Sequence, residues 1–237
     1  MKRLAFYSIL LSLSVFIYSC GGDDDPNPTK PATNVTSISR TNVALKVGET
    51  VDVAIKNYDT VVYVNNSNIA TIEKIDSLNY RIVGRKVGKT FIDLKTVKCN
   101  ITVNRYYAYF RDPSLSWGEG KNVVKAYELR TLKADDPSSI LYQENNSVCL
   151  KYVNYVFTDY KLSNIEMYFL PDKTIELNNY LNDYYIQSSQ IDPDYDLFES
   201  PLPKTDPSFF NVKVKKTPVN FNNVDYILVT LSNPIYN

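Results

Sequence analysis

The sequence predicts a mainly β protein, with an N-terminal β-sandwich followed by an α+β domain whose helices pack on an antiparallel sheet. Composition is the first reason: 20 Tyr, 10 Phe and 12 Pro stand beside only seven Gly among 237 residues, which favours strands and turns over helical bundles. The second is a series of short runs in which apolar and polar residues alternate. Only two stretches have helical spacing, so helices are a minor part.

Residues 33–104 contain short alternating runs that are separated by polar turns. The expected strands are 43–47, 51–56, 61–64, 80–83, 90–94 and 99–103. In the last run Cys99, Ile101 and Val103 share one face, which assigns them to the core. Short strands at this spacing are typical of a β-sandwich.

Four segments of this module carry a family resemblance. They are LKVGET at 45–50, NSNIATI at 66–72, RIVGRKVGKT at 81–90 and CNITV at 99–103. Together they resemble the bacterial Ig-like group 2 domain of intimin- and invasin-like proteins. The resemblance implies an Ig-like sandwich that serves as a spacer or binding module in adhesins and surface proteins, without catalytic residues.

The resemblance also assigns structural roles to single residues. The family often has Trp in the strand before the Ser-Asn turn, and we expect Tyr63 to fill that space in this chain. Gly48, Gly84 and Gly88 are interpreted as turn positions that need unusual backbone angles.

Residues 105–237 form the second module. After Trp117-Gly118 we expect a helix at 119–129, in which Val123 and Tyr127 are one turn apart. The expected strands that follow are 140–143, 148–157 and 161–169, with a hairpin turn at Asp159-Tyr160.

The same order of elements then recurs. Asp172 is a candidate N-cap for a helix that runs to about residue 186, in which Leu177, Tyr180, Leu181 and Tyr184 share one face. The expected strands after it are 195–198, 210–215 and 224–231. A helix followed by three strands, twice over, predicts helices on one face of a continuous sheet and raises the alternative of a tandem repeat. This half resembles domains of Bacteroidetes surface lipoproteins and of small outer-membrane assembly lipoproteins, which implies no activity.

The first 19 residues have the pattern of a signal peptide. Lys2 and Arg3 precede an apolar run, residues 4–18, that is too short for a transmembrane helix. Ser19-Cys20 resembles the lipobox of bacterial lipoproteins, apart from Tyr18, where a small or aliphatic residue is usual. The resemblance implies that Cys20 is acylated and becomes the first residue of the mature chain. A secreted protein with a chance cysteine is the alternative.

Residues 20–32 have the composition of a solvated tether. Gly21-Gly22 is followed by Asp23, Asp24 and Asp25, and then by prolines. The acidic run resembles the export tether of Bacteroidetes-type lipoproteins, which implies an outer-membrane lipoprotein exposed on the cell surface. A simple spacer is the alternative. Several acyl chains on one cysteine would hold the protein firmly to the bilayer.

Charge and histidine content exclude several functions. Lys+Arg and Asp+Glu number 26 each, so no net field steers the chain toward nucleic acid. The absence of His removes Ser-His-Asp and Cys-His pairs and HExxH zinc sites. We therefore expect no enzyme, no cofactor and no metal.

An alternating acidic segment could suggest a calcium loop. Asp192, Asp194 and Asp196 have the required spacing, but Leu197 and Pro203 occupy positions where an EF-hand needs glycine and glutamate. A solvated loop is the preferred interpretation.

If Cys20 carries lipid, Cys99 and Cys149 are the two cysteines left to form a disulfide. They fall in different expected modules, each inside an apolar strand pattern. We interpret both as buried small hydrophobic residues rather than as a bridge.

Trp117 is the one candidate ligand-binding residue. Its ring could stack on a sugar; alternatively it plugs the start of the first helix beside Leu115 and Gly118, which is the preferred interpretation. Lys121 and Lys125 are interpreted as an exposed helix face.

The sequence therefore predicts a non-enzymatic binding or adhesion module on an Ig-like spacer, anchored in the membrane through Cys20 and directed at a glycan or a surface protein. One alternative is a structural subunit of an envelope or fimbria-like assembly. Another is a carboxylate-dependent accessory protein for glycan hydrolysis, for which no carboxylate pair is singled out.

Overall fold

A computed structural model describes residues 35–106, 108–206 and 208–235. The protein is mainly β, with 47% strand and 11% helix, which confirms the expected fold class. The expected signal peptide, Cys20 and the tether residues Asp23, Asp24 and Asp25 lie outside the described residues. From Val35 onward the chain forms one compact unit.

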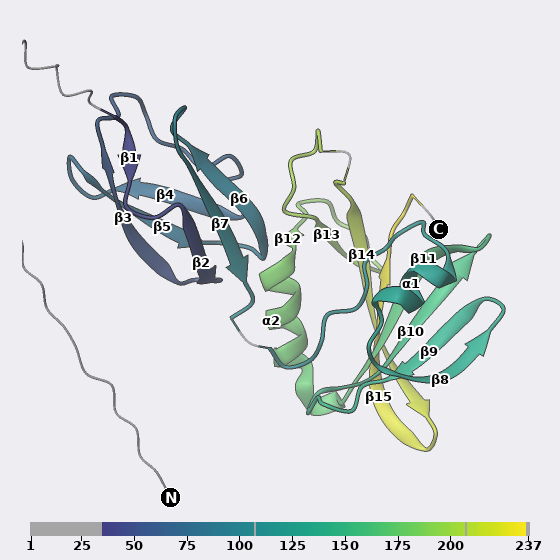
Figure 1. The fold of residues 1–237 in the computed structure, drawn as a ribbon. Coiled ribbons are helices and arrows are strands. Elements are labelled where there is room, and N and C mark those ends of the chain that lie inside the picture. The colour runs from purple at the N-terminus through teal and green to yellow at the C-terminus, as the bar shows by residue number, and fades with distance from the viewer. Residues whose placement is uncertain (1–34, 107, 207, 236–237) are drawn as a thin grey trace, which may run out of the picture. The chain divides into compact units, whose positions relative to one another are not determined.

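The first seven strands form two sheets (Figure 1). They are β1 (Ser37–Ile38), β2 (Asn42–Lys46), β3 (Thr50–Lys56), β4 (Ala70–Lys74), β5 (Asn79–Gly84), β6 (Gly88–Asp93) and β7 (Lys98–Asn104). One sheet has the order β1-β3-β5-β4 and the other β2-β7-β6, in which β2 and β7 are parallel. Side chains from both sheets meet in one hydrophobic cluster, and Cys99, Ile101 and Val103 belong to it as the alternation predicts.

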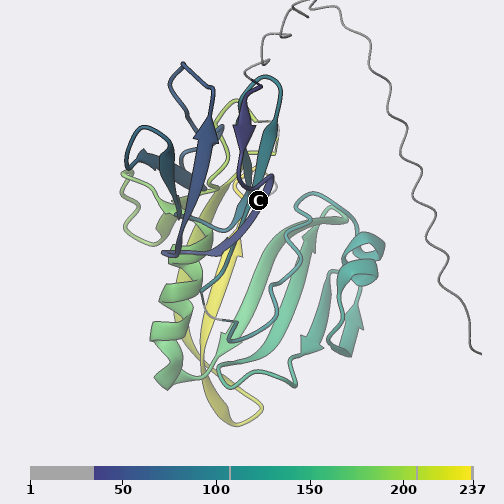
Figure 2. The ribbon, with the colours of Figure 1, turned by 60° about the vertical axis from the view of Figure 1, so that its left-hand side comes forward.

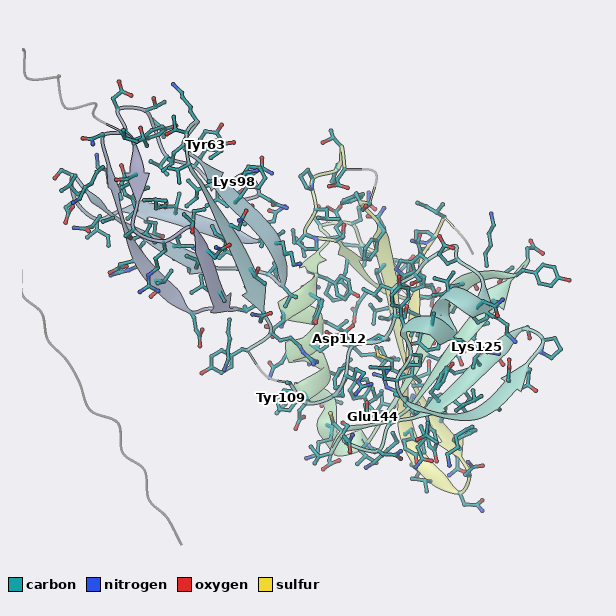
Figure 3. All side chains as sticks on the ribbon, in the orientation of Figure 1. Tyr63, Lys98, Tyr109, Asp112, Lys125 and Glu144 are labelled. Carbon is teal, nitrogen blue, oxygen red and sulfur yellow. The ribbon has the colours of Figure 1, made fainter. Side chains whose placement is uncertain are left out.

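Tyr63 does not fill the space expected for it. Its side chain is 65% exposed, and Figure 3 shows it on the outside of the sandwich. Val64 is buried instead and forms an isolated bridge with Ile92, which is all that remains of the strand expected at 61–64. Because successive side chains of an extended chain point to opposite sides, burying Val64 turns Tyr63 outward.

The three glycines of the sandwich serve different needs. Gly48 and Gly88 have φ of 83° and 156°, which matches the expected unusual backbone angles. Gly84 lies at the end of β5 without a positive φ, and there the prediction was wrong. A Cβ at Gly84 would lie 2.6 Å from the backbone oxygen of Lys46, so glycine is needed for close approach of two strands.

The second half forms an antiparallel sheet with two α-helices. The helices are α1 (Lys121–Tyr127) and α2 (Thr174–Tyr184), the latter preceded by a short 3-10 turn, η1 (Pro171–Lys173). The strands are β8 (Thr131–Asp136), β9 (Ser139–Gln143), β10 (Leu150–Thr158), β11 (Lys161–Phe169), β12 (Ile186–Gln187), β13 (Asp196–Glu199), β14 (Asn211–Phe221) and β15 (Val224–Ser232). Their order in the sheet is β12-β13-β14-β15-β11-β10-β9-β8.

The expected recurrence of elements is present, with four strands after each helix instead of three. The sequence reading missed β8, which is polar and exposed, and β12, which has two residues. The hairpins β10-β11 and β14-β15 both have two-residue turns with positive φ, at Asp159-Tyr160 and Asn222-Asn223.

The two hairpins adjoin at the centre of the sheet, where β11 pairs with β15. Asn164, the fourth residue after the β10-β11 turn, pairs with Ser232, the ninth residue after the β14-β15 turn. Conversely, Ile227, the fourth residue after the β14-β15 turn, pairs with Phe169, the ninth residue after the β10-β11 turn. The two hairpins are therefore related by a local twofold axis.

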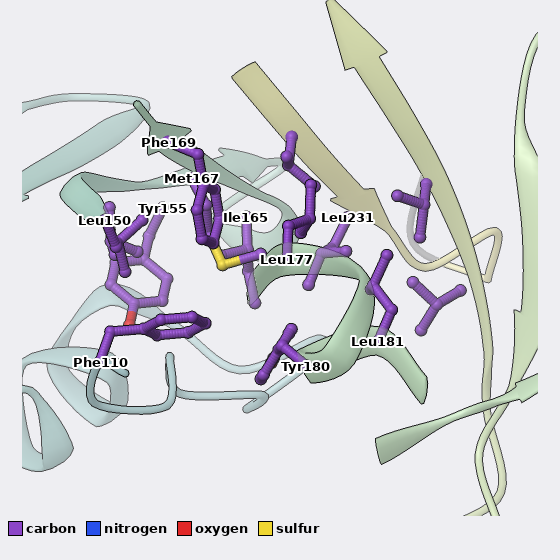
Figure 4. Packing of buried hydrophobic residues seen from close by; sticks show 14 of the residues in the cluster. Phe110, Leu150, Tyr155, Ile165, Met167, Phe169, Leu177, Tyr180, Leu181 and Leu231 are labelled. Carbon is purple, nitrogen blue, oxygen red and sulfur yellow. The ribbon is translucent and has the colours of Figure 1, made fainter. Parts of the chain in front are cut away.

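Helix α2 packs on one face of this sheet (Figure 2). Leu177, Tyr180 and Leu181 are buried in the cluster and Tyr184 packs against it, as their spacing predicts. Figure 4 shows Leu177, Tyr180 and Leu181 near Phe110 and the central strands. Asp172 is not the N-cap, because η1 precedes the helix and Lys173 occupies the cap position without a side-chain bond.

Cys99 and Cys149 are both free and buried, in different hydrophobic clusters. This confirms their interpretation as small hydrophobic residues and excludes the bridge between them in this structure. Burial raises the pKa of both thiols, which keeps them in the protonated, less reactive form.

Candidate functional site

Trp117 lies in a groove of about 660 Å³. Four aromatic rings, four aliphatic side chains and four polar side chains form its walls. The lining residues are Leu115, Ser116, Trp117, Glu119, Val123, Tyr127, Leu202, Ser208, Phe209, Phe210, Asn233 and Ile235. They come from three parts of the chain: residues 115–127, which include α1, the β13-β14 loop, and the segment after β15.

Helix α1 supplies one wall. Only Val124 of this helix is buried in the core. Val123 and Tyr127, one turn apart as the sequence shows, line the groove, and Tyr127 is 71% exposed. The apolar pair that marked the helix in the sequence thus belongs to the groove.

The segment before α1 is fixed to the sheet by backbone hydrogen bonds. The amide of Gly118 donates to the carbonyl of Leu162 over 3.0 Å, and the amide of Leu162 donates to the carbonyl of Glu119 over 2.9 Å. Gly118 has φ of 76°, a left-handed conformation that glycine adopts without strain. These bonds hold the segment that carries Trp117 beside Leu162, at the start of β11.

The opposite wall is held by a buried serine in the β13-β14 loop. The amide of Ser200 donates to the carbonyl of Phe210 over 2.9 Å, and the amide of Phe210 donates to Ser200 Oγ over 3.2 Å. The ring centroids of Phe210 and Trp117 are 6.4 Å apart. The adjoining carbonyl of Pro201 accepts hydrogen bonds from the side-chain amides of Asn66 and Asn68, so the sandwich also supports this loop.

The groove has little charge and one unsatisfied donor. Glu119 is the only charged side chain among the described lining residues. Trp117 Nε1 is buried and has no hydrogen-bond acceptor within the described part of the chain. A buried donor without a partner costs about 1–3 kcal/mol, so this atom lowers the stability of the fold.

Lys121 and Lys125 do not form a free helix face. Both bind Asp135 of β8, with Lys121 Nζ 2.9 Å from Asp135 Oδ1. The hydrogen bonds from Lys125 and Lys121 lower the pKa of Asp135. Figure 3 shows Lys125 on α1, and the two lysines tie this helix to the edge strand.

A second polar cluster, the Arg130 network, lies just after α1. The guanidinium of Arg130 donates to Glu128 over 2.8 and 2.9 Å, to Glu144 over 3.1 Å and to the carbonyl of Arg111. The side chains of Arg130 and Glu128 are each 1% exposed and that of Glu144 is 6% exposed. Two carboxylates therefore share one buried cation.

Tyr155 extends the network into the sheet core. Its hydroxyl donates to Glu128 over 2.5 Å and accepts from the amide of Ser114 over 2.9 Å. Burial raises the pKa of Tyr155, and the charge of Glu128 raises it further. Within the described ranges, Glu128, Arg130, Glu144 and Tyr155 leave no buried side-chain polar atom without a partner. Sequence reasoning missed this cluster because its residues do not differ by type or spacing from surface charges.

The alternating acidic segment is divided between two lysines. Asp192 lies 3.4 Å from Lys213 Nζ and accepts a bond from the amide of Asp194, while Asp196 lies 3.2 Å from Lys216 Nζ. No group of three or more acidic or cysteine side chains among the described residues could hold a metal ion.

Two comparisons with known proteins found no match. No protein-family model matches the chain, and a search of curated proteins gives no match either. Within the described ranges, neither helix has the length and apolar character needed to span a bilayer.

Proposed function

We propose that this chain is a lipid-anchored, surface-exposed protein of the cell envelope that acts as a non-enzymatic binding module. The Trp117 groove is its ligand site, and the Ig-like sandwich is the spacer that also supports the β13-β14 loop. The observation that carries the proposal is the groove itself: four aromatic side chains from two separate chain segments meet in one concavity.

The size and lining of the groove fit a binding site. Small-molecule sites are concave, mostly apolar and about 300–1,000 Å³ in volume, with a few polar groups that orient the ligand. Tyr127 and Ile235 expose large apolar surfaces at its rim. Exposed apolar surface that is gathered around a concavity is typical of interaction sites rather than of ordinary surface.

The same residues argue against the hydrolase alternative at this groove. Glycoside hydrolysis needs two carboxylates flanking the bond. Among the described lining residues Glu119 alone carries a carboxylate, and Glu128 and Glu144 are buried against Arg130.

Strand addition at β8, one of the two edges at which an assembly subunit could extend this sheet, is also disfavoured. The strand is short, carries Lys133, Asp135 and Asp136, and has a register shift between Leu132 and Ala134. Charges and bulges on an edge strand oppose pairing with another chain.

Ligand binding can be read from Trp117 directly, because it is the only tryptophan in the chain. We expect selective excitation of tryptophan to show a saturable emission change when the purified full chain is titrated with a panel of glycans and surface proteins. Tyr63→Ala, which removes an exposed aromatic ring from the sandwich, is the matched control and leaves the titration unchanged. A panel without any response would overturn the binding function, and hydrolytic activity of the chain would overturn its non-enzymatic character.

The anchor is tested separately. Cells fed an alkyne analogue of palmitate should label the full chain, and Cys20→Ala should abolish the label. Cys99→Ala is the control, because it removes a buried thiol that is not the proposed acylation site. This variant should keep the label. Replacing Asp23, Asp24 and Asp25 by Asn should protect the protein from protease added to intact cells, since the acidic run is proposed to direct export. Labelling of the Cys20→Ala chain would contradict the anchor.

A further inference from the structure

We infer that the ligand of the Trp117 groove is an uncharged oligosaccharide, and that acidic sugars are disfavoured because the described lining residues include no cationic side chain and one anionic one, Glu119. This inference rests on the proposed function and narrows its ligand class. Three features of the groove carry it: its aromatic surfaces, its neutral polar groups and the sign of its single charge.

The aromatic surfaces fit sugar rings. One face of a pyranose presents C–H groups, which pack on an aromatic ring while the hydroxyls remain at the edge of the sugar. Trp117, Tyr127, Phe209 and Phe210 offer such rings on different walls. Because the walls come from three separate chain segments, a ligand of more than one ring can contact several of them within about 660 Å³.

The polar groups fit hydroxyls rather than carboxylates. The hydroxyls of Ser208, which is exposed, and of Ser116, which pairs with Ser114 Oγ at 2.9 Å, can each donate and accept, as a sugar hydroxyl also does. Asn233 is 1% exposed and its Oδ1 already accepts from the amide of Ile235, so it contributes less. The indole N–H of Trp117 is a neutral donor without a partner among the described residues. The nitrogen itself is covered by neighbouring atoms, so the ring and not the N–H is the part of Trp117 that a ligand in the groove contacts.

The charge of the groove opposes anions. No lysine or arginine is among the described lining residues, so a carboxylated, sulfated or phosphorylated sugar would lose water without gaining an ion pair. Glu119 adds a repulsive charge at the rim. Because Glu119 is exposed, solvent and salt screen this repulsion, and its share of the discrimination is modest.

The test compares ligands that share their sugar rings and linkages and differ in charge. A panel of neutral oligosaccharides first identifies a binder of the full chain by tryptophan emission. Oligogalacturonides are then compared as their full methyl esters and as the free acids, and cello-oligosaccharides are compared with the uronic acids made from them by oxidation at C6. We expect the neutral member of each binding pair to bind at least about tenfold more tightly, the effect of roughly 1.4 kcal/mol.

Substitution of Glu119 sharpens the test. Glu119→Gln should narrow the gap between acid and ester by about threefold, and raised salt should narrow it in the original chain but not in the variant. Glu73→Gln, the same charge change on an exposed strand of the sandwich, is the control and leaves the gap unchanged.

Failure of the inference and failure of the proposed function give different results. Acidic members that bind as tightly as neutral ones would overturn the inference and leave the binding function intact. A response to surface proteins or peptides without any response to glycans would also overturn the inference alone. No response to any member of either panel would overturn both.

Discussion

The Trp117 groove and the Arg130 network both lie next to α1, and they differ in whether their buried polar atoms have hydrogen-bond partners. In the Trp117 groove an indole N–H has no partner among the described residues, and the walls are open and aromatic. In the Arg130 network, which follows the helix, each buried side-chain polar atom in the described ranges has a partner. The groove thus contains an unpaired donor, whereas the network pairs all of its buried side-chain polar atoms within the fold.

The contrast separates function from stability. Buried charges are tolerated when they are paired and hydrogen-bonded, and removing one partner is strongly destabilising. A neutral donor without a partner costs less. We therefore expect substitutions in the network to lower stability and substitutions in the groove to lower binding.

The largest effect is expected from Arg130→Met. The change leaves Glu128 and Glu144 buried without a cation, so the free energy of unfolding should fall by about 3–5 kcal/mol in urea titrations. Arg81→Met is the matched control, because Arg81 binds Asp52 through two hydrogen bonds on the surface of the sandwich. Its effect should lie close to the error of the measurement. Equal losses in the two variants would remove the distinction between buried and exposed pairs.

Tyr155→Phe should cost less, about 1–3 kcal/mol. It removes the hydroxyl that donates to Glu128 and accepts from the amide of Ser114, and leaves the ring in the core. Urea unfolding measures the loss, and near-ultraviolet circular dichroism checks that packing is retained. Loss of binding without loss of stability would instead connect this hydroxyl to the groove.

Alkaline pH should act through the same hydroxyl. The folded pKa of Tyr155 is raised above the ordinary value of about 10. The folded state therefore holds this proton at pH values where the unfolded state has released it. The stabilisation is fully present below about pH 10 and is lost as pH rises further. Unfolding curves between neutral and alkaline pH should show a shallower decline for Tyr155→Phe than for the original chain. Tyr160→Phe, whose ring is 88% exposed, should leave the decline unchanged.

The smallest effect on stability is expected from Trp117→Phe. The change removes the unsatisfied N–H together with part of the ring, so the two contributions offset each other and stability should change by less than about 1 kcal/mol. Binding of the ligand should fall by about tenfold or more, measured by calorimetry because the fluorescent ring is lost. Loss of stability with unchanged binding would make Trp117 a plug of the helix start and would remove the contrast between the two sites.

The sequence located strands better than it located faces. Alternation placed Cys99, Ile101 and Val103 in the sandwich core, since a strand with one buried side leaves a period of two. The family resemblance placed Tyr63 inside the sandwich, although only packing decides which of two neighbouring residues is buried. The polar strand β8 escaped notice because an exposed edge strand has no apolar face to reveal it.

The sequence also indicated Trp117 as a candidate binding residue, but it did not indicate which other residues form the groove with it. Trp117 stood out as the single tryptophan, whereas Phe209, Phe210 and Ile235 come from segments far away in the chain. The sequence by itself determined the mainly β class, the two helices, the hairpin turn at Asp159-Tyr160 and the burial of both cysteines, because local periodicity and turn chemistry encode these features. Tertiary structure alone decided that Val123 and Tyr127 line a groove and that Glu128 and Glu144 share Arg130. Such contacts depend on how distant segments pack, and residue type and spacing do not record that.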